Sequence, residues 1–306
     1  MDAIQKNLLE AVADLHEVPA GAYNIRANGK SIGRNSSENI EIVPKENADG
    51  IDIYIKAGTK KESVHIPVLL SQTGITEMVY NDFYIGEGAD VVIVAGCGIH
   101  NGGDKESRHD GIHTFHIGAG ARVRYVEKHY GAGDGNGKNV MNPTTVIEIE
   151  EDGSLEMETV QIKGVDDTKR YTKAVLQGEN AEFIVQEKLL THGNQVADSV
   201  MDVFLDGENS STRVISRSVA QDESTQIFYP RVVGNTACFG HVQCDSIIMG
   251  KAKVRSIPEI SCNHVDAGLI HEAAIGKIAG DQILKLQTLG LSYEEAEEKI
   301  LEGFLR

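Results

Sequence analysis

The chain has 306 residues, of which 41% are hydrophobic and 25% are charged, the composition of a soluble globular protein. Its formal net charge of -17 argues against a nucleic acid or an anionic membrane as partner, because both require a basic surface. No apolar run approaches the roughly 20 residues of a membrane-spanning helix. Four cysteines are too few for a disulfide framework, and the acidic N-terminus does not resemble a signal peptide. We therefore expect reduced thiols in a cytoplasmic protein.

The first residues predict one amphipathic helix. Apolar residues recur on one face at Leu8, Leu9, Val12 and Leu15, and the turn-forming sequence at 19–21 is expected to end the helix. Residues 1–22 therefore form a predicted N-terminal helical domain.

From residue 23 to residue 260 the pattern changes to short alternating runs rich in Val and Ile, which predict β-strands. A weak repeat runs through this region in "IGEGADVVIV", "IGAGARVRYV", "EEDGSLEMET", "LQGENAEFIV" and "LDGENSSTRV". In most copies a turn containing Gly or Asn precedes a small residue and an alternating strand, and the copies recur roughly every 30 residues, as in solenoids. The pattern favours a β-solenoid body over a meandering sandwich.

After residue 260 the hydrophobic period becomes helical again. A helix is predicted over 271–290, with its apolar residues near one face (Ala274, Ile278, Ile283 and Leu286). Gly290 stands at the expected C-cap, and Ser292 with Glu295 forms a capping box for a last helix. These signals predict a C-terminal helical domain over 261–306.

Two groups of residues are candidates for metal or thiol chemistry. The first is "CGIHNGGDKESRHDGIHTFH", which contains Cys97, His100, His109, His113 and His116. Imidazole and thiolate are ligands for zinc and iron, but the spacing matches no standard zinc motif. His113 and His116 should also point to opposite faces of a strand. Solvent-exposed histidines on a loop are the alternative interpretation.

The second group contains Cys244, Cys262, His264, His271 and Glu272. In a solenoid, residues distant in sequence stack on adjacent turns, which would bring Cys244 near His271 and Glu272. A thiolate, an imidazole and a carboxylate form a ligand set suitable for iron. A buried cysteine beside a helix-capping glutamate explains the same residues equally well.

The C-terminal third resembles the SufB/SufD family of iron–sulfur cluster assembly proteins. The resemblance lies in "QCDSIIMG", "RSIPEI" and "LIHEAAIGKIAGDQILKLQTLGLSYEEAEEKILEGF" and extends more weakly over the β body. It implies a mainly β fold, a right-handed parallel β-helix with a short N-terminal helix and a C-terminal helical unit. It also implies a partner, a SufC-type ABC ATPase docked on the C-terminal helices. Family members pair side by side, and clusters are thought to assemble at that interface from iron and cysteine-derived sulfur.

Individual residues can be matched to this resemblance. Cys244 matches the active cysteine of the scaffold, and His271 and Glu272 match its neighbouring site residues. A chain with all three resembles SufB more than SufD, which implies a homodimer carrying a transient iron–sulfur cluster of unknown type. Cys97, Cys262 and His264 remain secondary candidates.

The chain is shorter than a typical SufB and lacks the longer N-terminal region with its cysteine motif. That departure leaves open both flavin binding and the sulfur donor, for which a cysteine desulfurase is the first candidate.

The last helix is expected to dock the ATPase through Ile300, Leu301 and Phe304, although the same stripe could instead pack on the β body. The sequence thus predicts a scaffold protein rather than a turnover enzyme. One alternative is a SufD-like structural subunit that supports the ATPase complex without carrying a cluster. Another is a β-solenoid enzyme acting on polysaccharide, for which the expected secretion signal is not found.

Overall fold

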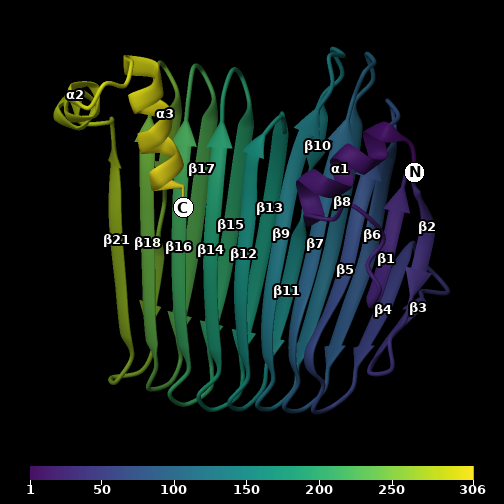
Figure 1. Cartoon of the computed structure of the whole chain (residues 1–306). Helices are drawn as coiled ribbons and strands as arrows, with labels where there is room; N and C mark the ends of the chain where they lie inside the picture. The colour runs from purple at the N-terminus through teal and green to yellow at the C-terminus, as the bar shows by residue number, and fades with distance from the viewer. Residues whose placement is uncertain (306) are drawn as a thin grey trace.

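The chain forms a β-solenoid of about eight turns, with one helix at its N-terminal end and two at its C-terminal end (Figure 1). This is a computed structural model, and it describes residues 1–305. Successive strands contribute alternately to two facing sheets, which confirms the predicted mainly β solenoid. Pairing between neighbouring turns is parallel, and antiparallel pairing occurs at the N-terminal end, between β1 and β2 and between β3 and β4. The division into three domains at residues 22 and 260 stays a prediction.

The ten-stranded sheet contains, in spatial order, β2 (Lys30–Asn35), β1 (Ala22–Ala27), β5 (Lys60–Leu70), β7 (Asp90–His100), β9 (Arg122–Ala132), β12 (Ser154–Lys163), β14 (Glu182–Thr191), β16 (Ser211–Ala220), β18 (Phe239–Ile248) and β21 (Gly268–Gly276). The eleven-stranded sheet contains β19 (Lys253–Ser256), β17 (Thr225–Gly234), β15 (Val196–Leu205), β13 (Asp167–Leu176), β10 (Asn139–Met141), β8 (Ser107–Ile117), β6 (Thr76–Ile85), β4 (Gly50–Ile55) and β3 (Ile40–Pro44). β11 (Thr144–Ile149) pairs with β13 and β8, and β20 (Glu259–Cys262) pairs with β17.

The repeated turns of the sequence set the spacing of the solenoid. One residue of each copy has a left-handed backbone, with φ between 53° and 64°, at Gly88, Gly120, Asp152, Asn180 and Asn209. Glycine, asparagine and aspartate are the residues that adopt this conformation at least cost. Each of these turns also bonds to the next, as where the Asp152 N–H donates to the Glu179 carbonyl at 2.8 Å. The repeat is therefore the sequence of a stacked turn.

The space between the two sheets is filled mainly by aliphatic side chains, with a few aromatic rings among them. Phe83 and Phe115 lie on neighbouring strands and stack at 4.5 Å between ring centroids, and Tyr125 packs against Phe115 from the opposite sheet. All three are fully buried. In-register pairing explains the stack, because it places equivalent side chains one strand spacing apart on the same face.

Helix α1 (Ala3–Ala13) covers the outer face of β5, β7 and β9 (Figure 1). It buries Leu8, Leu9 and Val12, three of the four residues from which it was predicted. It ends at Ala13, before the predicted turn at 19–21, because Asp14 adopts a left-handed conformation with φ 52°. The helix lies close to the sheet because Gly98 has no side chain: a Cβ there would lie 3.1 Å from the Leu8 side chain.

The C-terminal region differs from its prediction at its beginning. Residues 271–276, predicted as helix, belong to strand β21, which continues the ten-stranded sheet beyond residue 260. Helix α2 (Gly280–Thr288) follows, and the backbone of Gly290 lies just beyond its end with φ 99°. Helix α3 (Tyr293–Phe304) begins with the predicted capping box of Ser292 and Glu295. None of the helices described within residues 1–305 has the length and apolar character needed to cross a membrane.

We expect Gly207→Ala to lower the free energy of unfolding by about 2–3 kcal/mol, because a Cβ there would overlap the neighbouring turn. That atom would lie 1.8 Å from the Gly178 carbonyl oxygen. Urea denaturation followed by circular dichroism measures the change. Gly276→Ala is the matched control, because a Cβ at Gly276 has no other atom within 4 Å. Equal effects of the two substitutions would contradict the close stacking of the turns.

Candidate functional site

Cys244 lies inside the solenoid. It is an inward-facing residue of β18, between Val242 and Ser246 in the strand alternation, and it is 3% exposed. The thiol lines a small internal cavity of about 20 Å³ together with Ser216 and Ser256. This volume is enough for about one water molecule. Burial, with smaller contributions from Glu187 and Asp245, raises the pKa of Cys244 to about 11.

A continuous inward row links this cysteine to buried polar residues of earlier turns. In register along the ten-stranded sheet, Glu127 pairs with Thr159, Thr159 with Glu187, Glu187 with Ser216, and Ser216 with Cys244. Cys244 therefore occupies the last fully covered position of a polar row, because the next residue of that row, Ala273 on β21, is exposed.

His271 lies on the same side of the sheet as Cys244. It is on β21 and pairs with Val242, whose side chain points inward like that of Cys244. The His271 Nε2 atom is buried and has no hydrogen-bond partner within the described chain. Burial lowers the pKa of His271, with a further contribution from His241, so its neutral form is favoured. A neutral imidazole with an unpartnered nitrogen is the form that binds metals.

Glu272 points the other way. It pairs with Gln243, which lies on the outer face of β18, and its side chain is 65% exposed. Its Oε2 atom lies 3.5 Å from Nε2 of His241, also on the outer face. The strand alternation therefore separates Glu272 from the Cys244 and His271 pair within one chain.

The secondary candidates are dispersed. Cys97 is buried on β7, and four strands of the ten-stranded sheet (β9, β12, β14 and β16) separate it from β18. Cys262 is exposed at the end of β20, and His264 follows it in the connection to β21 with Asp266 at 4.0 Å. Across residues 1–305, three or more His, Cys, Asp or Glu side chains nowhere converge closely enough to hold a metal ion.

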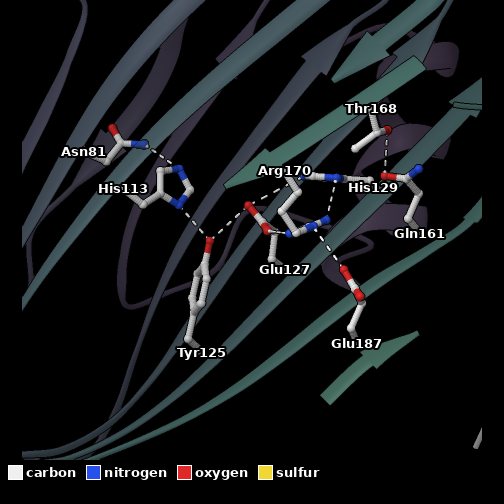
Figure 2. Close-up of polar contacts among 9 residues, drawn as sticks. All are labelled: Asn81, His113, Tyr125, Glu127, His129, Gln161, Thr168, Arg170 and Glu187. Atoms are coloured by element: carbon white, nitrogen blue, oxygen red, sulfur yellow. Dashed lines mark hydrogen bonds and ion pairs between the residues drawn. The ribbon is translucent and has the colours of Figure 1, made fainter. Parts of the chain in front are cut away.

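A buried network of charged and polar side chains crosses the interior between the two sheets (Figure 2). Arg170 on β13 lies at its centre, with Nη1 2.6 Å from Glu127 and Nε 3.6 Å from Glu187. The Tyr125 hydroxyl donates to Glu127 at 3.2 Å, and His129 Nδ1 lies 3.3 Å from Arg170. These five side chains are between 0% and 6% exposed, so the ion pairs are screened little by solvent.

The network keeps the Glu127 carboxylate ionised. Burial alone would raise the pKa of Glu127, but His129 and the Arg170 guanidinium hold it well below its ordinary value. Removing one partner of such a buried pair leaves an uncompensated charge, which is far more costly than losing an exposed pair. Arg170 is therefore the residue on which the polar interior depends.

Sequence reasoning missed this network, although a signal was present. In "ARVRYVEKHYG" the residues in phase with buried Val123 are Tyr125, Glu127 and His129, so the charged residues fall on the inward face. An alternating strand with charge on its buried phase indicates ionic partners across the interior.

Comparison with known protein families gives the context of these residues. Residues 72–304 match the family model described as "SUF system FeS cluster assembly, SufBD core domain". The chain belongs to the SufBD family. This confirms the resemblance described from the sequence. Members of the SufBD family are generally non-catalytic assembly subunits.

Individual relatives are distant in sequence but cover most of the chain. An iron–sulfur cluster assembly SufBD family protein of Methanothermobacter thermautotrophicus is 27% identical over 76% of this chain and 56% of its own length. One from Methanocaldococcus jannaschii is 28% identical over 83% of this chain and 79% of its own length. One from Archaeoglobus fulgidus is 27% identical over 90% of this chain and 73% of its own length. The chain thus spans little more than half the length of the Methanothermobacter SufBD protein.

We expect iodoacetamide at pH 8 to alkylate Cys262 quickly and Cys244 slowly. Because the pKa of Cys244 is about 11, only about one Cys244 thiol in a thousand is ionised at pH 8. The side chain is also buried, which limits access of the reagent. Peptide mass spectrometry over a time course measures the order of modification. Unfolding the chain in urea should make the two thiols equally reactive. Rapid alkylation of Cys244 in the folded SufBD protein would contradict its buried position.

Proposed function

We propose that this chain is a scaffold subunit for iron–sulfur cluster assembly, in which Cys244 binds iron or accepts sulfur and His271 completes the site. The observation that supports this most is that Cys244 and His271 share the inner face of the last two strands of one sheet. The family description, SUF system FeS cluster assembly, is the reason for proposing an iron–sulfur cluster as what is assembled on the chain. In this proposal the protein works in the cytoplasm with a SufC-type ABC ATPase and receives sulfur from a donor such as a cysteine desulfurase.

The end of the solenoid supports the proposal that the scaffold is a homodimer. β21 is the edge strand of the ten-stranded sheet and exposes Ile270, Ala273 and Ile275. An uncovered edge with apolar side chains is a template for pairing with another strand. Pairing of two copies around a two-fold axis would place two Cys244–His271 pairs beside one interface. It would also allow Glu272 of each chain to face a partner rather than solvent.

The alternative function is a structural subunit that supports the ATPase without carrying a cluster. The deep burial of Cys244 and the outward direction of Glu272 favour this reading for an isolated chain. The two functions differ in whether the protein binds iron and sulfide at Cys244.

We expect anaerobic reconstitution with ferrous iron and sulfide, in the presence of the ATPase, to give a brown protein whose iron content depends on Cys244. Cys244→Ala should lower bound iron and sulfide at least tenfold, because the thiolate ligand is lost. His271→Ala should lower both less severely. Chemical iron and sulfide analysis with visible absorption measures the effect.

The exposed thiol provides the control for that experiment. Cys262→Ala should leave the iron content unchanged, because Cys262 does not face the Cys244 cavity. A full cluster on Cys244→Ala would refute the ligand assignment. A wild-type protein that never binds a cluster would identify the structural subunit instead.

The C-terminal helices are the proposed docking site for the ATPase. Leu301 is buried in its own chain, and Ile300 and Phe304 are half-buried, so these three can offer only part of their surface. The largest exposed apolar side chains of this unit are Leu284, Leu289 and Tyr293, which are 52–74% exposed. We therefore extend the proposed docking surface from α3 to α2 and the turn between them.

We expect a chain truncated after Gly290 to lose binding to the ATPase in co-purification, because α3 is removed. Leu284→Ser combined with Leu289→Ser should weaken binding at least tenfold in the full-length chain, since exposed apolar anchors carry most interface energy. Exposed Val265, outside the helices, gives the control Val265→Ser, which should bind normally. Undiminished binding by the truncated chain would refute docking through α3.

A further inference from the structure

One inward row of the eleven-stranded sheet ends in a cysteine at the C-terminal end of the solenoid. The row consists of in-register residues at the ends of successive strands: Ile117, Ile149, Leu176, Leu205, Gly234 and Cys262. The first four are buried aliphatic side chains of the core. Gly234 interrupts the row because it has no side chain, and Cys262 on β20 is the next and last member.

The sulfur of Cys238 fills the space that Gly234 leaves. A Cβ built on Gly234 would lie 2.8 Å from Cys238 Sγ, which is shorter than a van der Waals contact. Cys238 directly precedes β18, and the residues that directly precede β9, β12, β14 and β16 are small: Ala121, Gly153, Ala181 and Ser210. The turn before β18 therefore exchanges two sizes, with glycine in the aliphatic row and cysteine in the row of small residues.

This exchange brings two thiols next to each other. Cys262 is the in-register neighbour of Gly234, whose side-chain space holds the Cys238 sulfur. In-register residues of neighbouring strands lie about 4.8 Å apart with their side chains on the same face. Burial raises the pKa of Cys238, Thr236 opposes that shift, and the charge of an ionised Cys262 adds to it, so the two thiols interact.

The surroundings hold one thiol in place and leave the other accessible. Cys238 is 7% exposed, and its carbonyl accepts from the Gly268 N–H at 2.9 Å. Cys262 is exposed at the end of the four-residue strand β20. The Asn263 N–H donates to the Gly234 carbonyl at 2.8 Å, which keeps Cys262 beside the space of the Cys238 sulfur. The exposed side chain can therefore turn toward the buried one to reach the distance of a disulfide.

We infer that Cys238 and Cys262 form a redox-active dithiol, which closes reversibly to a disulfide by exchange with a low-molecular-weight disulfide. The thiolate of exposed Cys262 attacks one sulfur of the small disulfide, releases one small thiolate and forms a mixed disulfide. The thiolate of Cys238 then attacks Cys262 Sγ, and the second small thiolate leaves. Two protein thiols are oxidised, one small disulfide is reduced to two thiols, and these take up the two cysteine protons.

The disulfide would change how the last turn of the solenoid opens. It joins the residue before β18 to the last residue of β20, and the loop that it closes contains Cys244. A cross-link across this loop restricts its unfolded states. The dithiol goes beyond the proposed cluster site, because its closure requires neither iron nor Cys244.

The test exposes the reduced full-length chain to glutathione disulfide, followed by intact-mass and peptide mass spectrometry. We expect each chain to lose two hydrogen atoms and to yield a peptide pair joined through Cys238 and Cys262. Cys97 and Cys244, which are buried, should stay reduced, and dithiothreitol should restore the two thiols. A chain that stays reduced, or that joins Cys262 to any other cysteine, would overturn the inference.

Single substitutions separate the two steps of the reaction. Cys238→Ser should accumulate a glutathione adduct on Cys262, about tenfold above the wild-type level, because the second thiol is missing. Cys262→Ser should remain largely unmodified, because Cys238 is buried. An equal amount of stable adduct on wild type and Cys238→Ser would show that Cys238 does not react with Cys262, and would refute the dithiol.

Gly234→Ala tests the placement of the sulfur, because its methyl group would occupy the space of Cys238 Sγ. Closure of the disulfide should slow about fivefold or more, with a matching rise in the adduct on Cys262. Gly276→Ala is the matched control, since its Cβ meets no atom within 4 Å, and it should close at the wild-type rate. Circular dichroism checks that both variants are folded. Unchanged closure in folded Gly234→Ala would contradict the proposed placement of the two thiols.

Discussion

In-register parallel pairing is the constraint on which the rest of this molecule depends. Each inward side chain has an equivalent one strand spacing away on the same face, so polar and apolar residues extend as rows along the solenoid. The row from Glu127 through Glu187 to Cys244 is one example. A charge on such a row cannot reach solvent and must find its partner across the interior, as Glu127 does with Arg170. The fold thus determines where ionic and thiol chemistry can be buried.

The repeated turns made the body of the fold predictable from the sequence. Asp152, Asn180 and Asn209 recur because each occupies a left-handed position in a stacked turn. The start of the C-terminal unit was not predictable in this way. "HEAAIG" carries residues with high helix propensity, but pairing with β18 holds it as strand β21, and tertiary pairing outweighs local preference. A single sequence contains no local signal of that pairing.

The candidate sites, like the fold, were predictable from the sequence only in part. The strand alternation predicted that His113 and His116 face opposite sides, and they do: His113 is buried, whereas His116 pairs with Glu148 outside. The sequence could not predict which of the histidines lie close together. That depends on the path of β8 and on Gly111, and no rule of residue spacing includes either. For the C-terminal group, adjacency in sequence was misleading, because consecutive residues His271 and Glu272 necessarily point to opposite faces of a strand.

The end of the solenoid differs from its interior in a way that suits the proposed function. The interior network is enclosed between two sheets, so its ion pairs are held in place by the whole fold. Around Cys244 the covering turn is incomplete, since β19 and β20 are short and most of β21 is exposed. Segments with few buried contacts open at lower free-energy cost than the core. If the scaffold proposal holds, this is the place where a buried thiol can be reached by local opening, and where closing a second chain over β21 would cover it again. The same argument explains why His271, at the rim, has an unpartnered nitrogen that the interior histidines largely avoid.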